Sequence, residues 1–286
     1  MIDVDPLGKF MAMIVGPNGG GKSIAIASWM KRGSIYFFDF DGRMASVANW
    51  YKQRGLKRGQ LQYDTYGPEN LYEAVKKLDS FIDRCDHAAI VLDSFTAITV
   101  SAVMFSLRRR MNKGPNSGKY PTLTSGDMIV PDWDEYKGET VLVTQMLDLC
   151  KAIAAKGVAV FWTAHPVSST KIEGKTYGIQ TRYAAYGQKS DSLLPIYFNE
   201  IYHLTTEHDF ATDSRRRLCF TQPFLGVNAK TALNLPAQFD WTDGNFYDIF
   251  TNLVHEGQVK AEENNKQLEE NNNQDPNIET STSNPF

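Results

Sequence analysis

The chain has little of what marks a secreted or membrane protein. It contains only three cysteines in 286 residues, Cys85, Cys150 and Cys219. Their odd number and the lack of metal-ligand spacing favour free thiols in a reducing compartment. No apolar run approaches the roughly 18 residues of a membrane span, and the N-terminus lacks the basic-then-apolar order of a signal peptide. We therefore expect a soluble cytoplasmic protein with no membrane partner.

A strong excess of charge of one sign is also missing, since the net charge is −3 with 42% hydrophobic residues. Such a composition can bury a large core. The acids concentrate at the C-terminal end, where residues 256–286 hold seven acids against Lys260 and Lys266 and few apolar side chains. A segment of this kind cannot bury enough surface to fold. We expect one globular domain over residues 1–255 and a disordered acidic tail over 256–286.

The most specific pattern is a glycine-rich segment after an apolar strand at 11–15. It is a phosphate-binding P-loop (Walker A), in which backbone N–H groups wrap the phosphates. Lys22 would reach the β- and γ-phosphates, the Ser23 hydroxyl would bind Mg²⁺, and the helix beginning at Lys22 would direct its positive end at the anions. The pattern predicts ATP and Mg²⁺ as cofactors, bound by Gly16, Pro17, Asn18, Gly19, Gly20, Gly21, Lys22, Ser23 and Ile24.

Apolar strands and helical segments alternate along the domain. Strands are expected at 11–15, 34–39, 61–65, 88–93 and 158–163, and helices at about 22–32, 43–54, from 68 onward, 95–109 and 138–155. This alternation predicts an α/β fold with a mainly parallel sheet flanked by helices. Residues 198–206 and 215–221 are expected to form an antiparallel hairpin, and a helix at about 244–254 to end the domain.

Acidic residues stand at the ends of two predicted strands. Asp93 ends the apolar strand at 88–93 and is expected to hold Mg²⁺ with Ser23, although it could instead cap the following helix. Ser94 comes next, where many P-loop ATPases have a glutamate, so the carboxylate that activates water must come from elsewhere. Asp41, in a loop, and Asp39, at a strand end, are the candidates, unless both are turn residues.

His165 follows the predicted strand at 158–163. A polar side chain at this edge of a parallel sheet can bond the γ-phosphate and report hydrolysis to the loop beyond it. A structural histidine is the alternative.

Together these motifs resemble a known family. The P-loop near the N-terminus, Phe-Asp-Phe-Asp-Gly at 38–42, Val-Leu-Asp-Ser at 91–94 and Phe-Trp-Thr-Ala-His at 161–165 are similar to motifs of the small RecA-like ATPases of bacteriophages. These are often labelled AAA-domain proteins and include single-strand-annealing recombinases. Segments at 194–202 and 229–233 also resemble this group, so the likeness covers about 10–255. Asp41 departs from the more usual glutamate, and the insert at about 111–136 is long.

The resemblance implies a RecA-like core, ATP hydrolysis, and rings or filaments of identical subunits on single-stranded DNA in the host cytoplasm. Basic residues fit such a partner, because cations bind phosphates and interleaved aromatics stack on bases. A solvated polar loop is the alternative. The expected DNA-binding residues are Arg108, Arg109, Arg110, Lys175, Arg182 and Lys189.

Arg215 and Arg217 share one face of the predicted hairpin. In RecA-like assemblies such a pair can enter the neighbouring ATP site as an arginine finger, and a solubilising edge strand is the alternative. The ending Pro285-Phe286 faintly resembles the tails with which single-stranded-DNA-binding proteins dock replication partners.

The leading hypothesis is a RecA-like ATPase that acts on single-stranded DNA in phage recombination or replication. A nucleotide-dependent switch or loader acting on a protein partner is the first alternative. A small-molecule kinase is disfavoured because no arginine-rich lid or acceptor pocket is apparent in the sequence.

Overall fold

The structure, a computed structural model, describes residues 9–55, 57, 60–113, 133–169, 180–183, 194–209, 213–223, 229–242 and 245–274. Eight strands form one sheet in the order β10-β9-β8-β1-β5-β4-β2-β3. They are β1 (Met11–Val15), β2 (Ile35–Asp39), β3 (Leu61–Thr65), β4 (Ala89–Asp93), β5 (Ala159–Ala164), β8 (Glu200–Asp209), β9 (Ser214–Phe220) and β10 (Gln238–Asp240).

The strands from β3 to β8 are mutually parallel, whereas β9 and β10 continue the sheet in antiparallel fashion. The expected α/β fold class, a mainly parallel sheet flanked by helices with a C-terminal antiparallel hairpin, is therefore confirmed. The hairpin of β8 and β9 belongs to the main sheet, because β8 pairs directly with the P-loop strand β1. A separate two-stranded ribbon, β6 (Pro166–Ser169) and β7 (Gln180–Tyr183), follows β5 and had not been expected.

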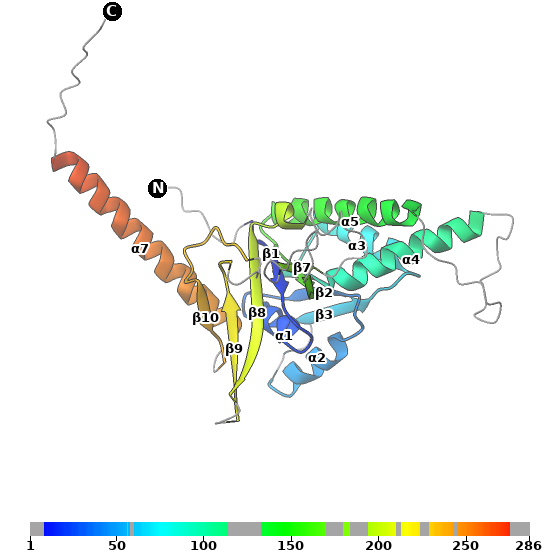
Figure 1. Ribbon diagram of the computed structural model, residues 1–286, viewed down its shortest axis with the longest axis horizontal. Helices are drawn as coiled ribbons and strands as arrows, with labels where there is room; N and C mark the ends of the chain where they lie inside the picture. The colour runs from blue at the N-terminus through cyan, green and yellow to red at the C-terminus, as the bar shows by residue number, and fades with distance from the viewer. Residues whose placement is uncertain are drawn as a thin grey trace, which may run out of the picture.

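Helices cover both faces of the sheet (Figure 1). On one face lie α3 (Leu71–Asp83), α4 (Phe95–Lys113) and α5 (Trp133–Ala154). On the other lie α1 (Lys22–Ala27), which continues as the 3₁₀ helix η1 (Ser28–Lys31), then α2 (Met44–Lys52) and α7 (Phe246–Gln274). Strands β1, β2, β4 and β5 are buried along their whole length, which is why their sequences are nearly continuous apolar runs.

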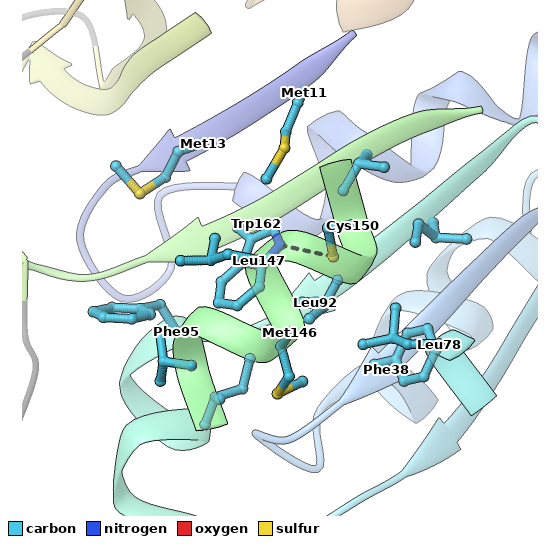
Figure 2. Packing of buried hydrophobic residues seen from close by; sticks show 14 of the residues in the cluster. Met11, Met13, Phe38, Leu78, Leu92, Phe95, Met146, Leu147, Cys150 and Trp162 are labelled. Carbon is cyan, nitrogen blue, oxygen red and sulfur yellow. Dashed lines mark hydrogen bonds between the residues drawn. The ribbon is translucent and has the colours of Figure 1, made fainter. Parts of the chain in front are cut away.

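The core on the α5 side contains large side chains from the central strands (Figure 2). Trp162 of β5 is fully buried there, and its indole Nε1 donates to Cys150 Sγ of α5 at 3.4 Å. All three cysteines are free, as expected. On the opposite side, Phe10 stacks on Trp29 of η1 with ring centroids 5.2 Å apart. Both faces of the sheet are thus covered by closely packed side chains.

Helix α7 corrects the expectation for residues after 254. It was expected to end there, with a disordered tail from 256, but it continues to Gln274. Its first turns are anchored by the buried side chains of Phe246, Phe250 and Val254, and a helix once started is extended at little cost. Glu262 lies four residues before Lys266, the favourable order for a helical ion pair. The later turns run away from the body of the molecule (Figure 1).

No helix among the described residues is long and apolar enough to cross a membrane. Residues 275–286, including Pro285 and Phe286, lie outside the described residues. The boundary between domain and tail at 255/256 stays a prediction.

Candidate functional site

The predicted site residues gather at the carboxyl ends of four neighbouring strands, β1, β5, β4 and β2. In this register Val15 pairs with Ala164 and Asp39 pairs with Asp93, so the segments that follow these strands leave the sheet side by side. Ligands bind at this edge of open parallel sheets. The sheet order thus unites residues that are up to 149 positions apart in the chain, from Gly16 to His165.

The P-loop holds its lysine tightly. Lys22 Nζ donates to the carbonyl oxygens of Gly16 at 2.8 Å and Pro17 at 3.0 Å. Burial lowers the pKa of Lys22 to about 8, against the opposing charges of Asp93 and Asp41. Gly21, just before it, has φ of +82°, and a Cβ there would lie 3.0 Å from the Trp241 ring. A glycine is required at this position by both backbone and space.

Ser23 and Asp93, the two residues expected to hold a cation, are hydrogen-bonded to each other. The Ser23 hydroxyl donates to Asp93 Oδ2 at 2.7 Å, and the Thr163 hydroxyl donates to Asp93 Oδ1. Burial raises the pKa of Asp93, while these two hydrogen bonds act in the opposite direction. Because the Ser23 proton is directed to Asp93, the lone pairs of Ser23 Oγ stay free for a cation. A hydroxyl and a carboxylate are hard oxygen ligands, which fit Mg²⁺ shared with substrate phosphates.

The two candidate bases have different surroundings. Asp39 is 1% exposed, and its oxygens accept the backbone N–H groups of Arg43 at 3.1 Å and Met44 at 3.0 Å. Both oxygens of Asp39 thus serve backbone N–H groups at the beginning of α2. Asp41 instead accepts a hydrogen bond from Ser94 Oγ at 3.0 Å.

Asp41 also faces the predicted sensor. His165 Nε2 lies 3.6 Å from Asp41 Oδ2, and His165 Nδ1 lies 3.3 Å from Lys22 Nζ. The ammonium of Lys22 can only donate, so Nδ1 accepts and Nε2 carries the ring proton toward Asp41. Burial raises the pKa of Asp41, but the hydrogen bonds from His165 and Ser94 outweigh it and hold that pKa below its usual range. Asp41 is thus an ionised carboxylate at neutral pH.

A pocket of about 280 Å³ adjoins the P-loop helix. Its aromatic walls come from Trp50 and Tyr51 of α2 and from Trp241, the residue whose ring a Cβ at Gly21 would meet. The guanidinium of Arg54 lies 3.8 Å from the centroid of the Trp50 ring. The lining residues are Ile24, Ser28, Trp50, Tyr51, Arg54, Arg217, Trp241, Asn245 and Phe246.

Several of these residues were missed by sequence reasoning. Thr163 and Ser94 could have been found from the sequence, since each is a polar residue at the end of a buried strand. Trp50 and Trp241 could not, because their pocket joins segments that are 191 residues apart in the chain. Aromatic residues are as common in cores as in binding sites, so composition could not separate them.

The predicted arginine finger residues lie on β9. Arg215 is exposed, whereas Arg217 is half-buried in its own chain, with its guanidinium 5.2 Å from the centroid of the Trp241 ring. Arg217 therefore lines the pocket beside α1. A role of Arg215 and Arg217 in a neighbouring subunit stays a prediction.

The predicted DNA-binding residues are placed only in part. Arg108 pairs with Glu69 at 2.7 Å and Arg110 with Glu135 at 3.2 Å, while Arg109 is exposed. Lys175 and Lys189 lie outside the described residues, and for Arg182 only the backbone, in β7, is described. The two ion pairs reduce the positive charge that α4 presents to a polyanion.

No protein-family model matches the chain, and no curated protein matches its sequence. Among solved structures, the chain is similar to the RadB recombinase at 14% identity and a TM-score of 0.44, over 74% of this chain and 80% of that one. It is also similar to the flagellar accessory protein FlaH from Methanocaldococcus jannaschii at 10% identity and a TM-score of 0.44, over 82% and 85% of the two chains. Likenesses of this size assign no activity, so the function has to come from the geometry of the site itself.

Proposed function

We propose that the chain binds ATP with Mg²⁺ and hydrolyses it. The supporting observation is that Lys22, the hydrogen-bonded pair of Ser23 and Asp93, and the ionised Asp41 lie together at one edge of the sheet. A phosphate cradle, a cation site and a carboxylate that can orient water are the parts that phosphoryl transfer to water requires. Colorimetric detection of phosphate released from ATP by the purified protein tests the proposal directly.

Each residue has a defined task in this reaction. Mg²⁺, held by Ser23 and Asp93, would neutralise charge on the β- and γ-phosphates. Asp41 orients the water whose oxygen bonds to the γ-phosphorus as the bond to the β,γ-bridging oxygen breaks, and it takes up the water proton. Lys22 stabilises the charge that develops on the phosphate oxygens. His165, in contact with both Lys22 and Asp41, senses the terminal phosphate.

The pocket lined by Trp50 and Trp241 would receive the base of the nucleotide. Ile24, which lines it, follows the proposed cation ligand Ser23 in the chain, and the aromatic walls of the pocket offer faces on which a base can stack. The indole Nε1 of Trp241 is buried and has no hydrogen-bond partner among the described residues. A base with an acceptor at its edge can satisfy this group.

Trp50→Ala is expected to weaken ATP binding about tenfold, because base stacking on an aromatic side chain contributes about 1–3 kcal/mol. Binding of inorganic tripolyphosphate, which has no base, should stay unchanged. Titration calorimetry with both ligands measures the difference, and Tyr72→Ala, an aromatic on α3 that is 58% exposed, serves as the control. An equal loss for both ligands would place the base elsewhere.

The proposed partner of the ATPase is single-stranded DNA, bound by an oligomer of identical subunits. The supporting observation is that the β6–β7 ribbon begins directly after His165, with Val167 paired to Arg182. The segment that carries Lys175, Arg182 and Lys189, three of the six expected DNA-binding residues, is thus joined to the proposed nucleotide edge. The finer resemblance, to phage single-strand-annealing recombinases, belongs to this proposal and rests on the motifs alone.

The triple variant Lys175→Ala, Arg182→Ala, Lys189→Ala is expected to bind single-stranded DNA more weakly and with less salt dependence. Each phosphate contact that is lost reduces the slope of log K against log salt by about 0.7, so three contacts change it by about two. Fluorescence anisotropy at several salt concentrations measures the slope. Lys52, Lys57 and Lys260, all exposed, give a matched triple control.

An unchanged slope in that experiment would favour the alternative function, a nucleotide-dependent switch acting on a protein partner. The ion pairs of Arg108 with Glu69 and Arg110 with Glu135 favour this alternative, because they occupy charges that DNA would otherwise engage. Stimulation of phosphate release by single-stranded DNA separates the two functions.

A further inference from the structure

One cation near the P-loop has no task in the reaction so far. Arg43 stands two residues after Asp41 and precedes the first turn of α2. Its guanidinium Nη1 donates to Asn18 Oδ1, within the P-loop, at 3.4 Å. The Arg43 side chain, which follows the carboxyl end of β2, thus reaches the loop that follows β1.

The backbone under Arg43 is fixed. Its N–H donates to Asp39 Oδ1 at 3.1 Å, and the next N–H donates to Asp39 Oδ2. Gly42 has φ of +68°, a conformation that lets the chain turn between Asp41 and Arg43. Because Asp39 is buried at the end of β2, Arg43 and Asp41 are held on one short turn attached to the sheet.

The charge of Arg43 is felt by both functional groups of the site. It contributes to the lowering of the pKa of Lys22, after burial as the main cause, and it helps to hold the pKa of Asp41 low. Arg43 also follows Asp41 by two residues, and its guanidinium contacts Asn18 in the loop that carries Lys22. Arg43 is exposed, so its side chain can move from Asn18 to a ligand without crossing the core.

We propose that Arg43 binds the terminal phosphate of ATP from within the same chain and acts there as the catalytic arginine. This inference rests on the proposed ATPase function. As the bond to the bridging oxygen breaks, charge is spread over the oxygens of the γ-phosphoryl group, and a planar guanidinium can bond two of them. Asn18 holds the side chain over the P-loop until the phosphate replaces it.

The assignment also removes the need for an arginine from a neighbour. Arg217, expected from the sequence to enter another subunit, lies against Trp241 in its own chain. Its partner in the expected pair, Arg215, is exposed on β9. Arg43 instead shares a turn with the proposed base, and each chain then carries a complete site.

The test compares ATP and ADP binding in Arg43→Ala and the unaltered protein. ATP affinity should fall about 10- to 100-fold, the value of a charged hydrogen bond, whereas ADP affinity should stay the same. Phosphate release at saturating ATP should fall about 10²-fold or more. Lys52→Ala, which removes an exposed cation at the last residue of α2, should change neither. Arg43→Lys should recover only part of the loss, because an ammonium cannot bond two phosphate oxygens with the planar geometry of a guanidinium.

Mixing variants decides whether Arg43 acts within the chain. Arg43→Ala and Lys22→Ala subunits should show no recovery when combined, because each site lacks one of the two cations. Recovery on mixing would place Arg43 in a neighbour's site and overturn the proposal, as would an unchanged ratio of ATP to ADP affinity in Arg43→Ala. If the unaltered protein binds ATP without hydrolysing it, the proposed ATPase function fails, yet the affinity ratio still decides the role of Arg43.

Discussion

Lys22→Ala should reduce ATP affinity about 100-fold and bring phosphate release to background, while the protein stays folded. The ammonium is the P-loop cation, and a charged hydrogen bond to phosphate contributes about 1.5–3 kcal/mol to binding. Its loss from the transition state costs a further factor of about 10² or more. Titration calorimetry and phosphate release measure the two effects.

The thermal stability of Lys22→Ala should change little, in contrast to its ATP binding and turnover. Lys22 is 6% exposed, and its buried charge is held by two carbonyl oxygens and His165. Removing both the charge and its desolvation cost should leave the melting temperature close to that of the unaltered protein. Lys31→Ala is the matched control and should retain full turnover. Lys31 is an exposed lysine in η1, just after α1, and it pairs with Asp248. Turnover in Lys22→Ala equal to that of the control would contradict the P-loop assignment.

The parts of the fold that follow from local patterns were predictable from the sequence. The apolar runs of β1, β2, β4 and β5 match buried parallel strands, and the P-loop could be assigned from Gly16 to Ser23 because its chemistry depends on adjacent residues. The order of these strands in the sheet could not be predicted from local sequence patterns. That β5 lies between β1 and β4, which brings His165 between Lys22 and Asp41, emerged only from the sheet order.

Two further features could not be read from pattern, for different physical reasons. The pocket next to α1 combines Trp50 with Trp241, and a pair so distant in the chain leaves no periodic signal. The length of α7 was underestimated because a polar composition predicts disorder when it is considered alone. In the folded chain, the buried turns of Phe246 to Val254 supply the nucleus from which the polar turns extend.

Asp39 and Asp41 show how two residues of the same type acquire different roles from their positions. Both acids of Phe-Asp-Phe-Asp-Gly were candidates for the base, and sequence alone left them open. The alternation of a strand directs Asp39 into the fold, where two backbone N–H groups occupy its oxygens. Asp41 lies beyond the end of the strand, in contact with Ser94 and close to His165.

The same substitution at both positions should therefore have opposite consequences. Asp41→Asn is expected to reduce phosphate release about 10²- to 10⁴-fold, because an amide cannot accept the proton of the attacking water. ATP binding should change little, since Lys22, Ser23 and the base pocket are intact. Single-turnover phosphate release together with calorimetry separates the chemical step from binding.

Comparison with Asp39→Asn decides which of the two aspartates is the base. Its amide nitrogen cannot accept, so one N–H at the beginning of α2 loses its partner at a cost of about 1–3 kcal/mol. The melting temperature should fall by about 2–4 °C for each kcal/mol, whereas turnover at low temperature should stay within a few-fold of the unaltered protein. If Asp39→Asn instead abolishes turnover in a fully folded protein and Asp41→Asn does not, the base is Asp39, and the cap at α2 must open when the nucleotide binds.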